Sequence, residues 1–286
     1  MQAMVLPSST SISSITLQVP NVGESLLFYR DLLGFVVKEV GGSRTTLSPG
    51  QHDAPVVFLI ETRNAIPRPP RTTGLFHVAF LFPGRKKLAE AFQRLYEHGW
   101  PFQGYADHGV SEALYLADPH GNGIELYADR PRDQWPYRNG ELQMVTAPLD
   151  LDSLLAEIGT KEEAALSAGS PRIGHIHLNV SDLGKAKRFY HDLLGFAVTQ
   201  ATFPGALFVA AGGYHHHLGL NVWNGRGAPG APPEAVGLVR FGIHVPDNPF
   251  VRQLAGRFQE EGIPAEIQSN AFMTRDFDGI SIIIHP

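Results

Sequence analysis

The chain has 286 residues, of which 43% are hydrophobic and 18% are charged, with a formal net charge of −5. This length leaves room for two ordinary domains, and the composition excludes a disordered or fibrous chain. Basic residues are not clustered, so neither a nucleic acid nor an anionic membrane is indicated, and we expect a small-molecule partner. No apolar run reaches membrane-spanning length, and residues 1–14 lack the pattern of a signal peptide. We therefore expect a cytoplasmic protein.

The chain contains no cysteine and 13 histidines. Disulfides, thiolate zinc sites and cysteine nucleophiles are therefore excluded. Any metal ion must be held by histidine and carboxylate side chains.

An internal repeat organises the chain, because FYRDLLGF in residues 28–35 recurs as FYHDLLGF in residues 189–196. Each copy follows an alternating strand, 15–19 or 176–180, and predicts a short amphipathic helix that ends at a glycine, Gly34 or Gly195. Three strand-like runs follow each helix: 35–40, 44–47 and 55–61 in the first copy, and 196–200, 206–210 and 217–223 in the second. The repeating unit is therefore βαβββ.

A second pair of units is weaker in pattern. One has a strand at 77–82, a helix at 86–98 and strands at 113–116 and 123–128; its counterpart has 239–245, 251–262, 272–275 and 280–284. The chain therefore contains four modules, which we divide into an N-terminal half (1–130), a connector (131–172) and a C-terminal half (173–286). The connector leads into an acidic helical piece at 152–168, and the Gly/Pro run 225–233 is expected to be a flexible loop able to close over a site.

Glu125 is the first candidate for chemistry, because it lies in the apolar run IELY of residues 124–127, directly after the turn sequence DPHGNG of residues 118–123. A carboxylate buried among strand residues loses favourable hydration, and this cost must be offset by a positive group nearby. A metal ion is such a group. The alternative is that Glu125 faces solvent, as isolated strand glutamates often do.

Four βαβββ modules with FYxDLLGF after the first strand resemble the vicinal oxygen chelate superfamily, which includes glyoxalases, extradiol dioxygenases and antibiotic-resistance binding proteins. The resemblance covers nearly the whole chain. It implies an α+β fold in which paired modules form two cupped, incomplete mixed-sheet barrels. It also implies that metal ligands lie on the first and last strands of the modules.

At the family's ligand positions this chain carries His77, Glu125 and His175, a set that is typical of non-haem Fe(II) sites, although Mn(II) uses the same ligands. The equivalent positions of modules one and four carry other residues: Ser14, Arg240 and Ile283. The three candidate ligands converge only if module two pairs with module three and module one with module four. The alternative for either histidine taken alone is a core residue with a satisfied hydrogen bond.

The stretch around Glu125 is similar to the signature of extradiol ring-cleaving dioxygenases through His108, Tyr115 and the Asp118-Pro-His-Gly121 turn. It departs from that signature only at position 106, where alanine stands in place of Gly, Asn, Thr, Ile or Val. The resemblance implies an Fe(II) enzyme that cleaves catechol-type aromatic diols with O2 to a muconic semialdehyde. His108 and Tyr115 would donate hydrogen bonds to the substrate oxygens, and the alternative for Tyr115 is core packing.

Similar enzymes carry a catalytic histidine before the last strand of module three, where this chain reads YHHHL in residues 214–218. Aligning Phe208 with the family strand places that histidine at His216, within one residue either way, and His216 would stabilise bound oxygen or shuttle a proton. A surface metal-scavenging cluster is the alternative. Asp118 is expected to shape the turn and not to act in catalysis.

Two rival functions remain on this fold. A glyoxalase-type isomerase or lyase would need a fourth ligand, supplied by Glu61 or by one of the histidines at 215–217. An antibiotic-sequestering module would need no metal, and the coincidence of the site residues argues against it. The sequence does not determine which ring substituents are accepted. It also leaves the oligomeric state open, and a homo-oligomer is one of the options.

Overall fold

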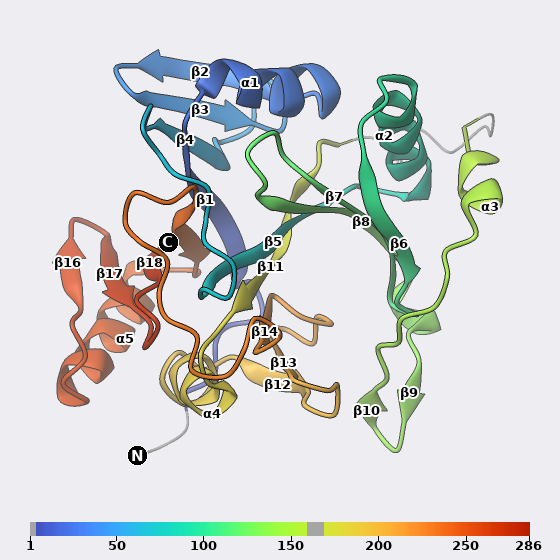
Figure 1. Cartoon of the computed structure of the whole chain (residues 1–286). Coiled ribbons are helices and arrows are strands. Elements are labelled where there is room, and N and C mark those ends of the chain that lie inside the picture. The colour runs from blue at the N-terminus through green and yellow to red at the C-terminus, as the bar shows by residue number, and fades with distance from the viewer. Residues whose placement is uncertain (1–3, 159–168) are drawn as a thin grey trace. The chain divides into compact units, whose positions relative to one another are not determined.

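The computed structural model describes residues 4–158 and 169–286 (Figure 1). Of the acidic helical piece expected at 152–168, residues 159–168 lie outside the described residues, and the described part begins with the short helix α3 (Leu151–Leu155). None of the helices in the described part of the chain is long and apolar enough to cross a membrane.

The first two modules follow the expected order of elements. Module one comprises β1 (Ser11–Val19), α1 (Val22–Leu26), η1 (Leu27–Leu32), β2 (Val36–Gly41), β3 (Arg44–Ser48) and β4 (Val57–Glu61). Module two comprises β5 (Gly74–Leu81), α2 (Arg85–Glu97), β6 (Phe102–Asp107), β7 (Ser111–Ala117) and β8 (Gly123–Asp129). The connector adds η2 (Arg132–Gln134), β9 (Tyr137–Arg138), β10 (Glu141–Leu142) and α3.

The last two modules repeat the pattern. Module three comprises β11 (Arg172–Asn179), α4 (Leu183–Lys187), η3 (Arg188–Leu193), β12 (Ala197–Gln200), β13 (Ala206–Ala210) and β14 (Leu218–Asn221). Module four comprises β15 (Gly237–His244), α5 (Asn248–Glu260), β16 (Glu266–Gln268), β17 (Ala271–Arg275) and β18 (Ser281–His285). Two strands of the modules, β6 and β16, were not expected, and neither were the short connector strands β9 and β10. All residues of β16 are exposed and β6 has one buried residue, so neither shows the alternation of a half-buried strand.

The order of strands in the two large sheets confirms the predicted pairing of modules. One eight-stranded sheet runs β16-β17-β18-β15-β1-β4-β3-β2, which joins modules four and one. The other runs β12-β13-β14-β11-β5-β8-β7-β6, which joins modules three and two. Both sheets are mixed: β1 is antiparallel to β15, whereas β5 is parallel to β8 and β11 to β14. The α+β class is thereby confirmed.

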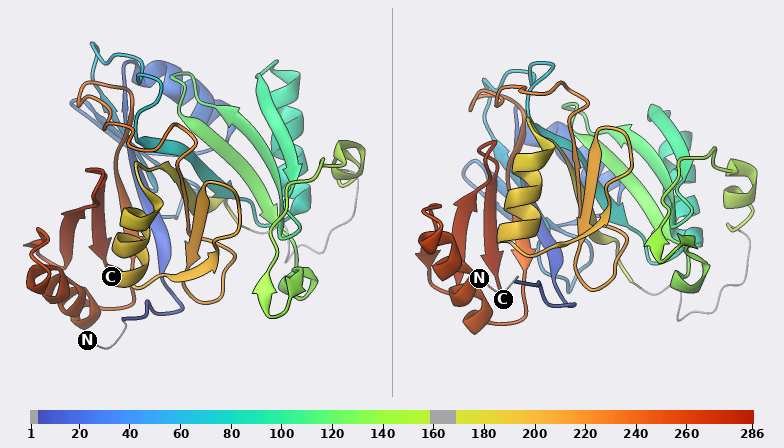
Figure 2. Two further views of the ribbon diagram at one scale, coloured as in Figure 1. Left: turned by 60° about the horizontal axis from the view of Figure 1, so that its bottom comes forward. Right: turned by 90° about the horizontal axis from the view of Figure 1, so that it is seen from below.

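The chain divides into two compact units. One contains the described residues up to Gln18, together with Asn64–Phe76 and His175–Pro286; the other contains Val19–Arg63 and the described residues of His77–Gly174. In the first unit, α5 packs on β17 and β18 (Figure 2). The ring of Phe258 in α5 contacts that of Phe272 in β17. In the second unit, α2 packs on β8, and Phe28 contacts Trp100.

The repeated motif forms a helix whose second half is π-helical, with Leu33 N donating to Phe28 O in the first copy and Leu194 N to Phe189 O in the second. Gly195 ends the second helix with φ 94°, and a Cβ there would lie 2.7 Å from the carbonyl oxygen of Met4. Both the conformation and the close approach therefore require glycine. The Phe and Tyr side chains of each motif are fully buried.

Candidate metal centre

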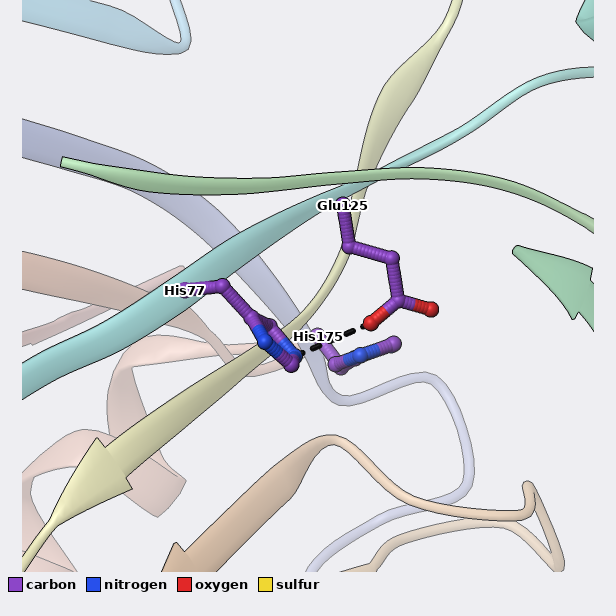
Figure 3. Close-up of side chains that lie close together, drawn as sticks. All are labelled: His77, Glu125 and His175. Carbon is purple, nitrogen blue, oxygen red and sulfur yellow. Dashed lines mark ion pairs between the residues drawn. The ribbon is translucent and has the colours of Figure 1, made fainter. Parts of the chain in front are cut away.

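The three candidate ligands come from three different strands: His77 from β5, Glu125 from β8 and His175 from β11 (Figure 3). All three are buried, and one ligand atom of each lies within 4.8 Å of the others. His77 Nε2 is 2.9 Å from Glu125 Oε2. Nitrogen and oxygen ligands lie about 2.1 Å from such metals, so two of them are at most about 4.2 Å apart on one ion. The group therefore needs only a small adjustment to hold one.

No other group of three His, Cys, Asp or Glu side chains within residues 4–158 and 169–286 has this geometry. The donor set is two imidazole nitrogens and one carboxylate, without a thiolate. This combination is typical of non-haem iron sites that keep open positions for substrates. The residues present therefore fit a divalent first-row metal ion.

The matching places of the other sheet carry no such donors. Glu125 pairs with Ala79, two residues after His77; in the other sheet Ile283 pairs with Gly242, two residues after Arg240. Isoleucine offers no ligand atom, and the Arg240 guanidinium, which contacts the sulfur of Met273, would repel a cation. Among its described residues, the sheet formed by modules one and four therefore has no equivalent cluster of metal ligands.

Tyr115 and His108 form a hydrogen-bonded pair beside Glu125. Tyr115 lies opposite Glu125 in the pairing of β7 with β8, and its hydroxyl is 2.7 Å from His108 Nε2. Burial first, and then the Glu125 carboxylate to which the hydroxyl bonds, raise the pKa of Tyr115 well above its usual value. The phenol is therefore protonated and available as a donor at neutral pH.

The tautomer of His108 follows from its second contact. Nδ1 lies 2.7 Å from the carbonyl oxygen of Val145, and because a carbonyl only accepts, Nδ1 carries the proton. In the neutral ring Nε2 is then an acceptor. The Tyr115 hydroxyl has a single proton, so at any one time it donates either to His108 Nε2 or to the Glu125 carboxylate.

The turn that leads into β8 is held by Asp118. Its Oδ1 accepts from the backbone N–H groups of His120 and Asn122, each at 2.9 Å, and its Oδ2 accepts from the Asn122 side chain. Tyr29, the tyrosine of the first FY motif, donates to the same Oδ2 at 3.1 Å. The structural role expected for Asp118 is therefore confirmed, and the FY motif has a purpose that the sequence did not reveal: it fixes the turn ahead of Glu125.

Of His215 and His216, the second lies nearer to His175. The two ring centroids are 4.1 Å apart, compared with 6.1 Å from His175 to His215. The Nδ1 atoms of His215 and His216 are 2.7 Å apart, so one donates to the other. His217 Nδ1 accepts from the backbone N–H of Ala211, a bond that ties it to the chain. All three are buried, which is not the arrangement of a surface cluster.

An aromatic row, made of Phe208, His177, Trp223 and Phe76, begins beside His216. The ring of Phe208 contacts those of His216 and His177 at 5.1 and 5.7 Å, and His177 contacts Trp223 and Phe76 at 5.2 and 5.1 Å. His177 is buried, whereas Trp223 and Phe76 are exposed. The sequence gave no signal for Phe76.

Residues 11–126 and 172–278 match the model of the family described as the Glyoxalase/Bleomycin resistance protein/Dioxygenase superfamily. The chain therefore belongs to this superfamily, as the repeated motif predicted. Among solved structures, a putative dioxygenase from Bacillus subtilis has a TM-score of 0.70 at 13% identity and covers 96% of this chain and 84% of its own. Glyoxalase I from Zea mays has a TM-score of 0.57 at 14% identity, with 97% and 92% covered. These likenesses concern the fold.

A closer similarity in sequence indicates the class of enzyme. The chain is 43% identical over 272 residues to a catechol-2,3-dioxygenase from Bacillus subtilis (strain 168), which covers 93% of this chain and 94% of that protein. It is 29% identical over 134 residues to a biphenyl-2,3-diol 1,2-dioxygenase from Rhodococcus globerulus, covering 46% of this chain and 70% of that protein. The prediction of an enzyme, an extradiol dioxygenase similar to catechol 2,3-dioxygenase, is confirmed.

Proposed function

We propose that this enzyme uses a divalent metal ion, Fe(II) in preference to Mn(II), to cleave catechol-type vicinal aromatic diols with O2. The observation that carries the proposal is the buried group of His77, Glu125 and His175, whose ligand atoms lie within 4.8 Å of one another. The similarity to a catechol-2,3-dioxygenase along 93% of the chain supports the choice of substrate class.

The charge of the donor set suits the substrate. The Glu125 carboxylate is the single anionic ligand beside two imidazoles, so a divalent ion keeps a net positive charge that attracts a deprotonated diol. When bound, the metal would lower the pKa of the diol oxygens and hold the diol and O2 next to each other.

Tyr115 and His108 are proposed to orient the diol. The protonated Tyr115 phenol donates a hydrogen bond, and His108, fixed by Val145 O through Nδ1, accepts from or donates to that phenol through Nε2. The pair can therefore take a proton from a substrate hydroxyl or return it without a change in heavy-atom positions. Fixed donors of this kind stabilise charge that develops on substrate oxygens.

His216 is proposed as the second proton-handling group. Its ring lies against that of His175, and an imidazole can accept a proton at one nitrogen and donate one from the other, so it can hold or release a proton at the atoms of O2. The contact with His215 Nδ1 fixes the orientation of the ring. His217 is proposed to be structural because its Nδ1 is occupied by a backbone N–H.

The expected product is a muconic semialdehyde. The bond between a hydroxyl-bearing ring carbon and its unsubstituted neighbour breaks; one atom of O2 completes a carboxyl group on the first carbon and the other an aldehyde on the second. All hydrogens of the diol are retained until the carboxyl group loses its proton to water. A neutral aromatic diol is thereby converted into a conjugated anion.

The test is to purify the protein without air, add Fe(II), and follow formation of the yellow ring-fission product from catechol and O2. We expect His77→Ala, Glu125→Ala and His175→Ala each to abolish both metal binding and product formation, while the exposed His52→Ala serves as a matched control with neither effect. If metal binds through the three residues but no diol is cleaved, a glyoxalase-type isomerase or lyase is the better assignment. If the three variants bind metal as well as the parent does, the site is wrong.

A further inference from the structure

An open surface pocket, which we call the arginine pocket, lies within the first compact unit. Its volume is about 480 Å³, and it is lined by Arg68, Pro69, Pro70, Arg71, Trp223, Asn224 and Gly225. Its two walls, 68–71 and 223–225, are tied together, because Asn224 Nδ2 donates to Thr72 O at 3.1 Å. This volume falls in the range of sites for small organic molecules.

The arginine pocket is positive in a chain whose net charge is −5. Arg68 and Arg71 line it, and no carboxylate does. Neither guanidinium forms an ion pair with a carboxylate of the residues that the structure describes. Arg68 Nη1 donates to the carbonyl oxygen of Leu75, a neutral partner that leaves the charge of the guanidinium uncompensated. Burial lowers the pKa of Arg68, which is the direction expected of a guanidinium that has lost water without gaining an anionic partner. The pocket therefore presents unneutralised charge to an incoming ligand.

The backbone at Arg71 is strained in a way that its side chain does not explain. Its φ is 59°, a left-handed conformation that glycine or asparagine adopts with less strain. The neighbouring backbone is fixed, since Thr73 N donates to Pro229 O at 2.9 Å and Thr72 Oγ1 to Pro69 O at 2.8 Å. A strained residue held by its surroundings is a frequent mark of a binding position.

Trp223 connects the arginine pocket with the row of aromatic rings. Its Nε1 donates to Pro204 O at 3.0 Å, which fixes the indole, and Gly205 leaves the space for it, because a Cβ there would lie 3.2 Å from that nitrogen. The indole contacts His177, which lies two residues after His175 on the same face of β11. The pocket is thus at the outer end of a row of rings that starts beside His216 and His175.

We propose that the arginine pocket binds the carboxylate of a small, flat, conjugated acid. The carboxylate would pair with the guanidinium of Arg71, whose fork geometry suits it, and with the N–H groups of Arg68 that do not bond to Leu75 O. The flat body would pack against Trp223. Two sources share this chemistry: the semialdehyde product, in which case the inference rests on the proposed function, and a diol substrate that carries a carboxylate on its ring.

The binding itself is tested on metal-free protein by isothermal titration calorimetry at low ionic strength, with sorbate, a six-carbon dienoate, as the probe. We expect 2,4-hexadien-1-ol, its uncharged analogue, to bind at least about tenfold more weakly. Arg71→Asn should weaken sorbate at least about fivefold without added strain, because asparagine accepts a positive φ. Trp223→Leu should also weaken it, whereas Arg252→Gln, an exposed arginine of α5, should not.

Absence of sorbate binding to the parent protein, or equal binding by Arg71→Asn with an unchanged unfolding midpoint, would overturn the proposal. Because this experiment uses neither metal nor turnover, its failure is independent of the dioxygenase assignment. The source is then identified on the metal-loaded enzyme. A weaker product inhibition in Arg71→Asn identifies the product; a loss of kcat/KM for 3,4-dihydroxybenzoate but not for 4-methylcatechol identifies the substrate. If Arg71→Asn alters neither, the pocket has no part in the reaction and the inference fails.

Discussion

The internal duplication supplies a matched pair of substitutions, Tyr29→Phe and Tyr190→Phe. Each removes a single hydroxyl that donates to a buried turn aspartate: Tyr29 to Asp118 Oδ2 at 3.1 Å, and Tyr190 to Asp276 Oδ2 at 2.8 Å. Both rings are fully buried, and phenylalanine retains their packing. The effect of each substitution is therefore that of one hydrogen bond to a carboxylate.

The two losses differ because of what each carboxylate oxygen retains. Asp118 Oδ2 still accepts from Asn122 Nδ2 at 2.9 Å after Tyr29→Phe. We therefore expect this substitution to lower the free energy of unfolding by about 2 kcal/mol. Asp276 Oδ1 accepts from Asp278 N and Ile280 N, but Oδ2 has Tyr190 as its one hydrogen-bond donor in the described residues. Tyr190→Phe leaves a buried anionic oxygen without a donor. We therefore expect it to lower the free energy of unfolding by about 3 kcal/mol.

The two variants should also differ in metal binding. The Asp118 turn begins β8, which carries Glu125, whereas the Asp276 turn begins β18, which carries Ile283. Tyr29→Phe should therefore weaken metal binding several-fold, as loss of supporting hydrogen bonds does elsewhere, and Tyr190→Phe should leave it unchanged.

Urea unfolding of metal-free protein, followed by far-UV circular dichroism, measures the free energies, and titration with Fe(II) in the absence of air measures the affinities. The reasoning is refuted if Tyr29→Phe is the more destabilising variant, or if both change metal affinity equally. If both variants lower the free energy of unfolding by less than about 0.5 kcal/mol, the hydrogen bonds of the tyrosine hydroxyls are no stronger in the folded protein than their hydrogen bonds to water in the unfolded chain.

Four further outcomes are expected. Glu125→Gln, which is nearly isosteric, should remove the rise in the thermal unfolding midpoint that excess Fe(II) gives the parent protein. At a metal concentration of 100 Kd that rise corresponds to about 2.7 kcal/mol of stabilisation. A retained rise would exclude Glu125 as a ligand. Tyr115→Phe should lower kcat by about 10²-fold in a stopped-flow assay while the metal affinity stays within a few-fold. His216→Gln should lower kcat more than His217→Gln does; the reverse order would shift the proton-handling role to His217. Burial raises the pKa of Asp276 to about 6. The pKa of Asp276 is higher in the folded than in the unfolded protein, so the protonated carboxyl should stabilise the fold below about pH 4. This contribution to the free energy of unfolding, about 3 kcal/mol, should be lost as pH rises through 6. Urea unfolding of Asp276→Asn should lack this dependence on pH.

The sequence by itself determined the modules and most of their elements. Two octapeptides differing at one position gave the duplication, and strand alternation with glycine-ended helices gave the βαβββ order, because these signals depend on neighbours within one element. The candidate ligands could also be found, since His77 and His175 occupy equivalent places in two copies. Their convergence requires one particular pairing of modules, which the strand order then confirmed.

Other features were decided only by the tertiary structure. Tyr29 and Asp118 are 89 residues apart, and Asn224 and Thr72 are 152 apart, so no local pattern reports either contact. The same holds for the contact between the rings of His216 and His175. The strands β6 and β16 were missed because β16 is exposed on both faces and β6 has a single buried residue, so neither shows a hydrophobic alternation. Periodicity tells which face of an element is buried; which distant side chain meets that face is set by packing of the whole chain.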